Sequence, residues 1–169
     1  MTDLFVVNGF PQVGKDTFCE YCCAELYNKY KRIGFIFSSI NKVEEAAHIL
    51  GWDGVKDDKG RKFLSDLKKL SVKNYDGPTK ELRKIIDQNK WHDPVIFYMV
   101  REPEEIEKLK KEFVLETILI TDGNIPENLS NDSDKNVNDY TYDYVIKNNG
   151  TKEDLENEAK DFIHKVLGG

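Results

Sequence analysis

Residues 4–18 read LFVVNGFPQVGKDTF, and this stretch decides the fold. A short apolar run leads into a loop bounded by Gly9 and Gly14, and residues with apolar positions at helical spacing follow Lys15. A strand, a glycine-bounded loop and a helix start form the context in which a GxxxxGK pattern binds phosphate. We therefore interpret residues 9–17 as a phosphate-binding loop, with an ordinary turn and helix cap as the alternative.

The residue types in this loop suit phosphate chemistry. Glycine at positions 9 and 14 allows backbone angles and a close approach that a side chain would block. The loop amides and the N-terminus of the following helix form an anion site. Lys15 brings a full positive charge to the outer phosphates. The residues expected to bind the nucleotide donor are Gly9, Gln12, Val13, Gly14, Lys15, Asp16 and Thr17.

The position after the lysine departs from the usual pattern. It commonly holds Ser or Thr, whose hydroxyl helps to bind magnesium, whereas here it holds Asp16, with Thr17 next. Phosphates repel a carboxylate unless it faces the metal or the water shell of the metal. We therefore expect Asp16 and Thr17 to serve Mg²⁺.

Length and composition indicate one globular domain over residues 1–169, with 39% hydrophobic and 33% charged residues. The net charge of −6 argues against general nucleic-acid binding. No apolar stretch approaches the ~20 residues of a membrane span, and no signal peptide is visible. We expect a cytoplasmic monomer or homodimer whose partners are small-molecule nucleotides, with no nucleic-acid or membrane partner. Cys19, Cys22 and Cys23 are interpreted as reduced helix residues.

Strand and helix patterns alternate along the chain, which predicts a three-layer α/β fold. The segment 94–100 is apolar on both faces, as a central parallel strand should be. A polar, glycine-punctuated segment, 51–61, is interpreted as a loop. Further strands are expected at 4–7, 34–37, 117–121 and 144–146, and helices at 14–31, 41–50, 62–73, 78–89, from 103 and from 151.

Positive charge is expected where the ligand binds, which in open parallel α/β sheets is beyond the carboxyl ends of the strands. Phosphoryl transfer needs cations around the transferring group, and arginine suits that geometry best. The chain has four arginines. Arg32 and Arg83 are expected on charged helix surfaces, which leaves Arg61 and Arg101 as candidates.

Each candidate has an ordinary alternative. Arg61 is otherwise a helix-surface charge, and Arg101 is otherwise the partner of Glu102 or Glu105 in a salt bridge. The other residues expected to bind the substrate are Lys56 and Asp57, the latter orienting a sugar hydroxyl.

Four segments together resemble a known family. They are GKDT at 14–17, GWDGVKDDKGRKFL at 51–64, VREPEEIEKLKKEF at 100–113 and SDKNVNDYTYDYVIKNNGT at 133–151. Their sequence and order are similar to those of the deoxynucleoside monophosphate kinase-like P-loop proteins of phages and bacteria, relatives of adenylate kinase. The resemblance covers most of the chain, and the second segment is its most specific part.

This resemblance implies a P-loop NTPase fold with a five-stranded parallel sheet and helices on both faces. It implies ATP and Mg²⁺ on the loop, a monophosphate site formed by a helical insertion at 51–90, and a lid-like loop at 122–140. Lys15 and Thr17 would bind the donor phosphates, and residues 143–148 would lie near the donor base.

The same resemblance assigns Arg61 and Arg101 to the acceptor or to the transferring phosphate, so that Lys15, Arg61 and Arg101 form the expected catalytic set. Kinases of this type usually carry arginines after the fourth strand or in the lid. Here Thr121-Asp122-Gly123 follows that strand, and from there to residue 147 the cations are Lys135 and Lys147. We therefore expect slow turnover.

The sequence thus predicts ATP-dependent phosphoryl transfer to a (deoxy)nucleoside monophosphate, giving the diphosphate. Two alternatives stay open. One is a kinase of another small phosphorylated metabolite, and the other is a non-catalytic nucleotide-binding protein with a degenerate lid.

Overall fold

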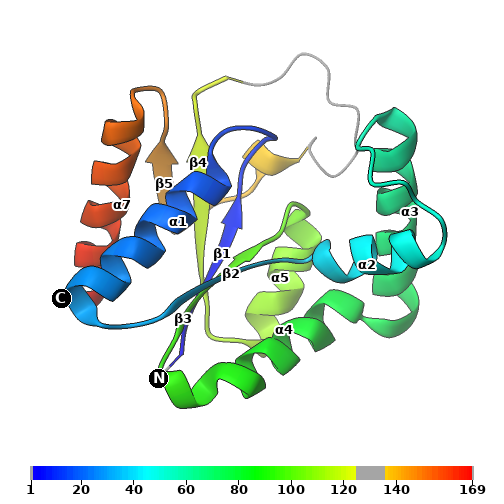
Figure 1. The fold of residues 1–169 in the computed structure, drawn as a ribbon, viewed down its shortest axis with the longest axis horizontal. Coiled ribbons are helices and arrows are strands. Elements are labelled where there is room, and N and C mark those ends of the chain that lie inside the picture. The colour runs from blue at the N-terminus through cyan, green and yellow to red at the C-terminus, as the bar shows by residue number, and fades with distance from the viewer. Residues whose placement is uncertain (1, 125–135, 169) are drawn as a thin grey trace.

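A parallel five-stranded sheet forms the centre of the computed structural model, which describes residues 2–124 and 136–168 (Figure 1). The strand order is β2-β3-β1-β4-β5, and every neighbouring pair is parallel. The strands are β1 (Asp3–Asn8), β2 (Gly34–Ser38), β3 (Val95–Met99), β4 (Glu116–Thr121) and β5 (Tyr144–Lys147). The expectation of a parallel five-stranded α/β sheet is confirmed.

Parallel strands need crossover connections, and in the described residues helical segments lie between consecutive strands. The α-helices are α1 (Lys15–Glu25), α2 (Asn41–Ile49), α3 (Asp58–Tyr75), α4 (Gly77–Asn89), α5 (Pro103–Glu112) and α7 (Lys152–Leu167). Shorter helical segments are η1 (Leu26–Tyr30), η2 (Lys90–His92) and η3 (Val137–Asp139). Among the described residues, no helix is both long and apolar enough to cross a membrane.

The two faces of the sheet carry separate cores, which gives the three layers. In β1, Phe5 and Val7 face a core that includes residues of α1 and α7, whereas Leu4 and Val6 face a core built with α4 and α5. Alternate residues of a strand point to opposite faces, so a strand that is apolar throughout can serve both cores. Figure 1 shows α1 and α7 packed together on one side, with α4 and α5 on the other.

Helices α2 and α3 form a smaller unit beyond the sheet, packed on Val43, Ala47 and Leu64 (Figure 1). Helix α3 begins at Asp58, so the sequence-based start near residue 62 was wrong. The side chain of Asp57 accepts a hydrogen bond from the backbone N–H of Gly60 and caps the helix.

The expected lid-like loop, 122–140, falls largely outside the described residues, because 125–135 are among those not described. On its described sides, the amide of Gly123 donates to the Thr121 hydroxyl, and Val137 lies in the core within η3. The lid therefore stays an expectation from the resemblance.

Candidate active site

The loop between β1 and α1 has the backbone that the sequence predicted. Gly9 has φ 153° and Gly14 has φ 93°, conformations that favour glycine. A Cβ on Gly9 would overlap the carbonyl oxygen of Ile120, and a Cβ on Gly14 would lie 2.6 Å from the side-chain nitrogen of Asn148. Both positions therefore need glycine for conformation and for space, and the loop opens at the N-terminus of α1 as an anion site requires.

Lys15 is held inside this loop. Its Nζ donates hydrogen bonds to the carbonyl oxygens of Gly9 and Phe10, both at 2.7 Å, and the residue is 9% exposed. The loop is braced from the end of β5, where the Asn148 side-chain amide donates to the carbonyl of Val13 at 2.9 Å. These contacts fix the position of the lysine ammonium against the carbonyls of the loop.

A cavity of about 420 Å³ lies beside the loop and joins it to the unit formed by α2 and α3. The sequence-predicted residues that line it come from three parts of the chain: Gln12, Lys15, Asp16, Lys56, Arg61 and Arg101. Residues from the loop between β1 and α1, from the segment around the start of α3 and from the end of β3 therefore meet at one place, beyond the carboxyl ends of the strands.

Other predicted residues do not line this cavity. Gly9 and Gly14 shape the loop, Val13 is buried in the core, and Thr17 is half-buried on α1. Asp57 serves as the N-cap of α3, with its Oδ1 2.8 Å from the nitrogen of Gly60, which gives this carboxylate a structural task. Its expected contact with a sugar hydroxyl is not part of this arrangement.

Lys56 and Arg61 contact one another, and Lys56 contacts α2. The Nε of Arg61 donates to the backbone carbonyl of Lys56 at 2.8 Å, and the Lys56 ammonium lies 2.6 Å from a carboxylate oxygen of Glu44. Arg61 lies in the first turn of α3, not in the loop where the sequence analysis placed it. These contacts hold the Nε end of the Arg61 guanidinium group at the wall of the cavity.

Arg101 follows β3 by two residues, and its backbone is tied to the sheet. The side-chain amide of Asn8, which is fully buried at the end of β1, donates to the carbonyl of Arg101 at 2.9 Å. The same amide donates to the Tyr142 hydroxyl at 2.8 Å. Glu102 and Glu105, the alternative partners considered for Arg101, both form ion pairs with Lys68.

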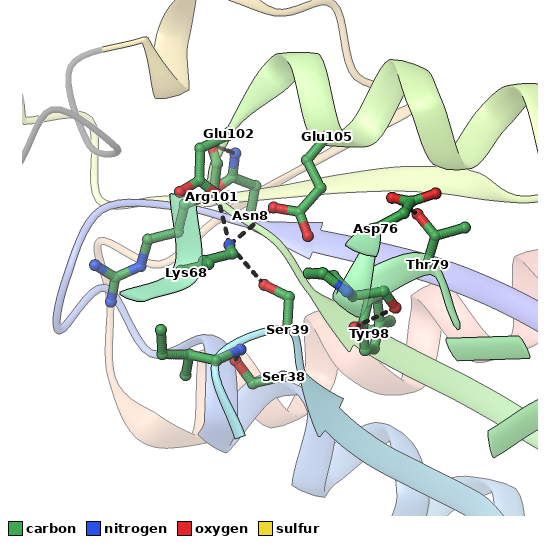
Figure 2. Close-up of polar contacts among 12 residues, drawn as sticks. Asn8, Ser38, Ser39, Lys68, Asp76, Thr79, Tyr98, Arg101, Glu102 and Glu105 are labelled. Atoms are coloured by element: carbon green, nitrogen blue, oxygen red, sulfur yellow. Dashed lines mark hydrogen bonds and ion pairs between the residues drawn. The ribbon is translucent and has the colours of Figure 1, made fainter. Parts of the chain in front are cut away.

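Lys68 is among the residues of this site that sequence reasoning missed. It lines the cavity from α3, is 6% exposed, and its Nζ contacts the Ser39 hydroxyl, Glu102 and Glu105 (Figure 2). Its spacing in the sequence could have identified it as buried. Positions 60, 64 and 68 lie at i, i+4 and i+8 and form the buried face of α3. A lysine on an apolar helix face needs a charged partner inside.

The charges of this cluster depend on burial. Burial raises the pKa of Glu105 to about 7, and the neighbouring Glu102 raises it as well, although Lys68 acts in the opposite direction. Burial lowers the pKa of Lys68, but the two carboxylates outweigh this, and its pKa lies above the ordinary value. Lys68 therefore stays charged, and Glu105 changes its charge near neutral pH.

A second cavity, of about 640 Å³, lies between α2, α3 and α4. Ser38 and Ser39 at the end of β2 line both cavities. The wall of the second cavity includes the largely apolar side chains of Val43, Leu67 and Tyr98. The fold thus has room beside the polar cavity for the uncharged part of a ligand.

The residues present fit Mg²⁺ if substrate phosphates supply part of its coordination. Within the ranges that the structure describes, no group of three or more His, Cys, Asp or Glu could hold a metal ion. Magnesium is commonly bound through one or two carboxylates together with substrate phosphates and waters. Asp16 lines the cavity next to Lys15 and supplies such a carboxylate.

Comparisons with known proteins support the fold. No protein-family model matches the sequence, and no curated protein matches it either. A crystal structure of shikimate kinase from Bacteroides thetaiotaomicron is similar with TM-score 0.52 and 12% identity, over 99% of each chain. An unliganded sugar kinase from Janibacter sp. HTCC2649 is similar with TM-score 0.53 and 12% identity, over 96% of this chain and 95% of that one.

These likenesses, together with the strand order and the loop geometry, define the class by fold: the chain has the P-loop kinase fold. At 12% identity they show the fold alone. The likeness to deoxynucleoside monophosphate kinases therefore rests on the four sequence segments that carry the resemblance.

Proposed function

We propose that this protein is an ATP-dependent kinase that transfers the γ-phosphoryl group to a small phosphorylated acceptor, a (deoxy)nucleoside monophosphate. The observation that carries the proposal is the meeting of Lys15, Arg61 and Arg101 at one cavity. Three cations from three separate elements around one space suit a reaction in which negative charge is shared between a donor and an acceptor phosphate.

On the donor side, the loop amides and Lys15 bind the outer phosphates of ATP. Lys15 exchanges the carbonyls of Gly9 and Phe10 for phosphate oxygens, which are stronger acceptors for an ammonium. Asp16 and Thr17 are the residues proposed to serve Mg²⁺, which when bound would neutralise part of the phosphate charge.

On the acceptor side, the planar guanidinium groups of Arg61 and Arg101 hold the acceptor phosphate in line with the donor. The helical segment 51–90, which contains α3 and α4, is proposed to supply the acceptor site. The second cavity beside Ser39 gives room for the sugar and base. Catalysis comes from position and charge, with no covalent intermediate.

A second candidate is a kinase of another small metabolite. The similar structures are titled a shikimate kinase and a sugar kinase, and the cavity is lined by Glu44 and Glu102 as well as by cations. Carboxylates suit an acceptor that presents hydroxyl groups. We place this candidate second because the cations that line the cavity outnumber its carboxylates, Asp16 included.

The third candidate, a nucleotide-binding protein without turnover, is favoured by the residues at the end of β4. In the described residues there, Thr121 to Asn124, no arginine or lysine is present. All three candidates are separated by measuring ADP formation from ATP and Mg²⁺ with a panel of nucleoside monophosphates and a panel of hydroxy acids and sugars. Stimulation by a monophosphate is expected, and stimulation by hydroxy compounds alone would overturn the acceptor class.

A further inference from the structure

The ammonium group of Lys68 is fully used by the protein. Its Nζ lies 2.9 Å from the Ser39 hydroxyl oxygen, 2.8 Å from an oxygen of Glu102 and 2.8 Å from an oxygen of Glu105. An ammonium has three protons to donate, so these three acceptors saturate it. Although Lys68 lines the cavity, it has no hydrogen-bond donor left for a ligand.

Two of its partners line the cavity themselves. Ser39 follows β2, and its backbone N–H donates to the carbonyl of Met99 at 3.0 Å, which fixes the residue to β3. Glu102 is the N-cap residue of α5 and lies next to Arg101. Because the Ser39 oxygen accepts from Lys68, its own hydroxyl proton is left to donate elsewhere. Figure 2 shows Lys68 between these side chains.

The third partner, Glu105, supports Lys68 from inside the fold. Glu105 is 7% exposed and does not line either cavity, and its Oε1 has no hydrogen-bond partner among the described residues. The groups facing it are Lys68 from α3, Glu102 at the start of α5 and Tyr98 from β3. With both carboxylates ionised the cluster carries one net negative charge, and with Glu105 protonated it is neutral.

We propose that Lys68 is a positioning residue of the acceptor site, which holds the Ser39 hydroxyl and the Glu102 carboxylate against the cavity, while the protonation of Glu105 behind it sets the charge that the acceptor phosphate meets. This inference rests on the proposed function. It deepens that function by naming the elements that orient the acceptor side.

The inference has two consequences for an acceptor that carries a phosphate. Without Lys68, Glu102 loses one ion-pair partner, so its carboxylate repels the acceptor phosphate more strongly. With Lys68 present, the neutral cluster below about pH 7 repels the phosphate less than the charged cluster above it, since Glu105 has its pKa at about 7. Acceptor affinity should therefore fall as pH rises through this range, while ATP affinity should not follow Glu105.

The test uses the whole chain, with the nucleoside monophosphate that gives the highest turnover in the panel as the acceptor. Lys68→Met keeps the length of the side chain and removes its charge. We expect its KM for the acceptor to rise about 10-fold or more, with its KM for ATP within about twofold of the wild-type value. Lys73→Met, an exposed lysine on the same helix, is the matched control and should change neither constant.

Glu105→Gln supplies a second readout, the pH dependence of the acceptor KM, which would not change if the cluster had only a structural role. Its amide stays neutral, so the ratio of the variant and wild-type acceptor KM values should be near one below about pH 6 and should fall several-fold below one at about pH 8. The acceptor phosphate also titrates in this range, but its titration is common to both proteins and cancels in the ratio.

Lys68→Met leaves Glu105 buried without its cation and could fail to fold, so Lys68→Met/Glu105→Gln, which removes both buried charges, is the second variant. It should fold and, at about pH 6 where the wild-type cluster is neutral, show the raised acceptor KM. An acceptor KM unchanged in this double variant, or a Glu105→Gln ratio that does not vary with pH, would overturn the inference. Wild-type protein that turns over no acceptor would instead overturn the proposed function itself, so the two failures are distinct.

Discussion

Two buried lysines face the same cavity, and the fold uses them in opposite ways. Lys15 donates to backbone carbonyls of its own loop, whereas Lys68 donates to two carboxylates and a hydroxyl from other elements. A carbonyl is a weaker acceptor for an ammonium than a phosphate oxygen, so a nucleotide can replace it. A carboxylate is not replaced in this way. We therefore propose that Lys15 binds a ligand and that Lys68 organises its neighbours.

The largest effect is expected at the ligand-binding lysine. Lys15→Ala should lower kcat/KM by about 10²-fold to 10³-fold, because an electrostatic contact to the transferring phosphate is lost. It should also weaken ADP binding, measured by calorimetry, while Lys73→Ala on the surface of α3 leaves both quantities unchanged. Equal ATP affinity in wild type and Lys15→Ala would remove Lys15 from the donor site.

The next effect concerns Arg61 and Arg101, the arginines that line the cavity together with Lys15. Arg61→Lys and Arg101→Lys keep the charge but lose the planar fork, so turnover should fall about 10-fold to 100-fold while ADP affinity stays within about twofold. Arg83→Lys is the matched control, because Arg83 pairs with Glu112 on the surface, away from the cavity. Normal kinetics in both cavity variants would leave the acceptor site without its proposed residues.

A smaller effect is expected on stability, through Glu105. Its folded pKa, about 7, lies above the ordinary value of 4.5, so the folded state holds a proton that the unfolded state releases. The stabilisation is present below about pH 4.5 and is lost as pH rises to about 7. Glu105→Gln lacks this loss, and its melting temperature should exceed that of wild type by a few degrees at about pH 8.

The control for this prediction is internal, since the two melting temperatures should differ much less at about pH 4.5. Calorimetric melting curves across that window give the comparison directly. A constant difference between the two proteins at all pH values would show that Glu105 does not titrate between these limits.

The smallest effect is expected at Asp16, which is exposed beside the loop. If its carboxylate contacts Mg²⁺ or water bound to Mg²⁺, Asp16→Ala should move the midpoint of the magnesium dependence of turnover upward by about 3-fold to 10-fold. Titration with magnesium at fixed ATP measures this. Identical curves for the two proteins would restrict Asp16 to the first turn of α1, where an acidic side chain favours the helix dipole.

The predictable parts of the site are those that residues close together in the chain determine. The apolar run before Gly9 and the GKDT residues encode a strand, a loop and a helix start within a few positions, and the structure has all three. Arg101 was predictable because a strand end in a parallel sheet points to the ligand edge. In each case, residues adjacent in the sequence are enough to predict the local structure.

The parts that were missed depend on contacts between distant residues. Lys68 looks like a surface residue until Glu102 and Glu105, which follow it by more than 30 positions, are folded against it. The start of α3 was placed too late, because the polar segment before residue 62 resembles a loop when the capping task of Asp57 is not known. Its carboxylate accepts from the backbone N–H of Gly60 and caps the helix.

The most direct test is the formation of ADP from ATP and Mg²⁺ by the wild-type chain, measured with and without each nucleoside monophosphate and with Lys15→Ala as the reference. A kinase of the proposed kind produces ADP and the acceptor diphosphate in equal amounts, only when the acceptor is present and only with Lys15 in place. ADP formation that no monophosphate increases, or that Lys15→Ala retains in full, would contradict the proposal.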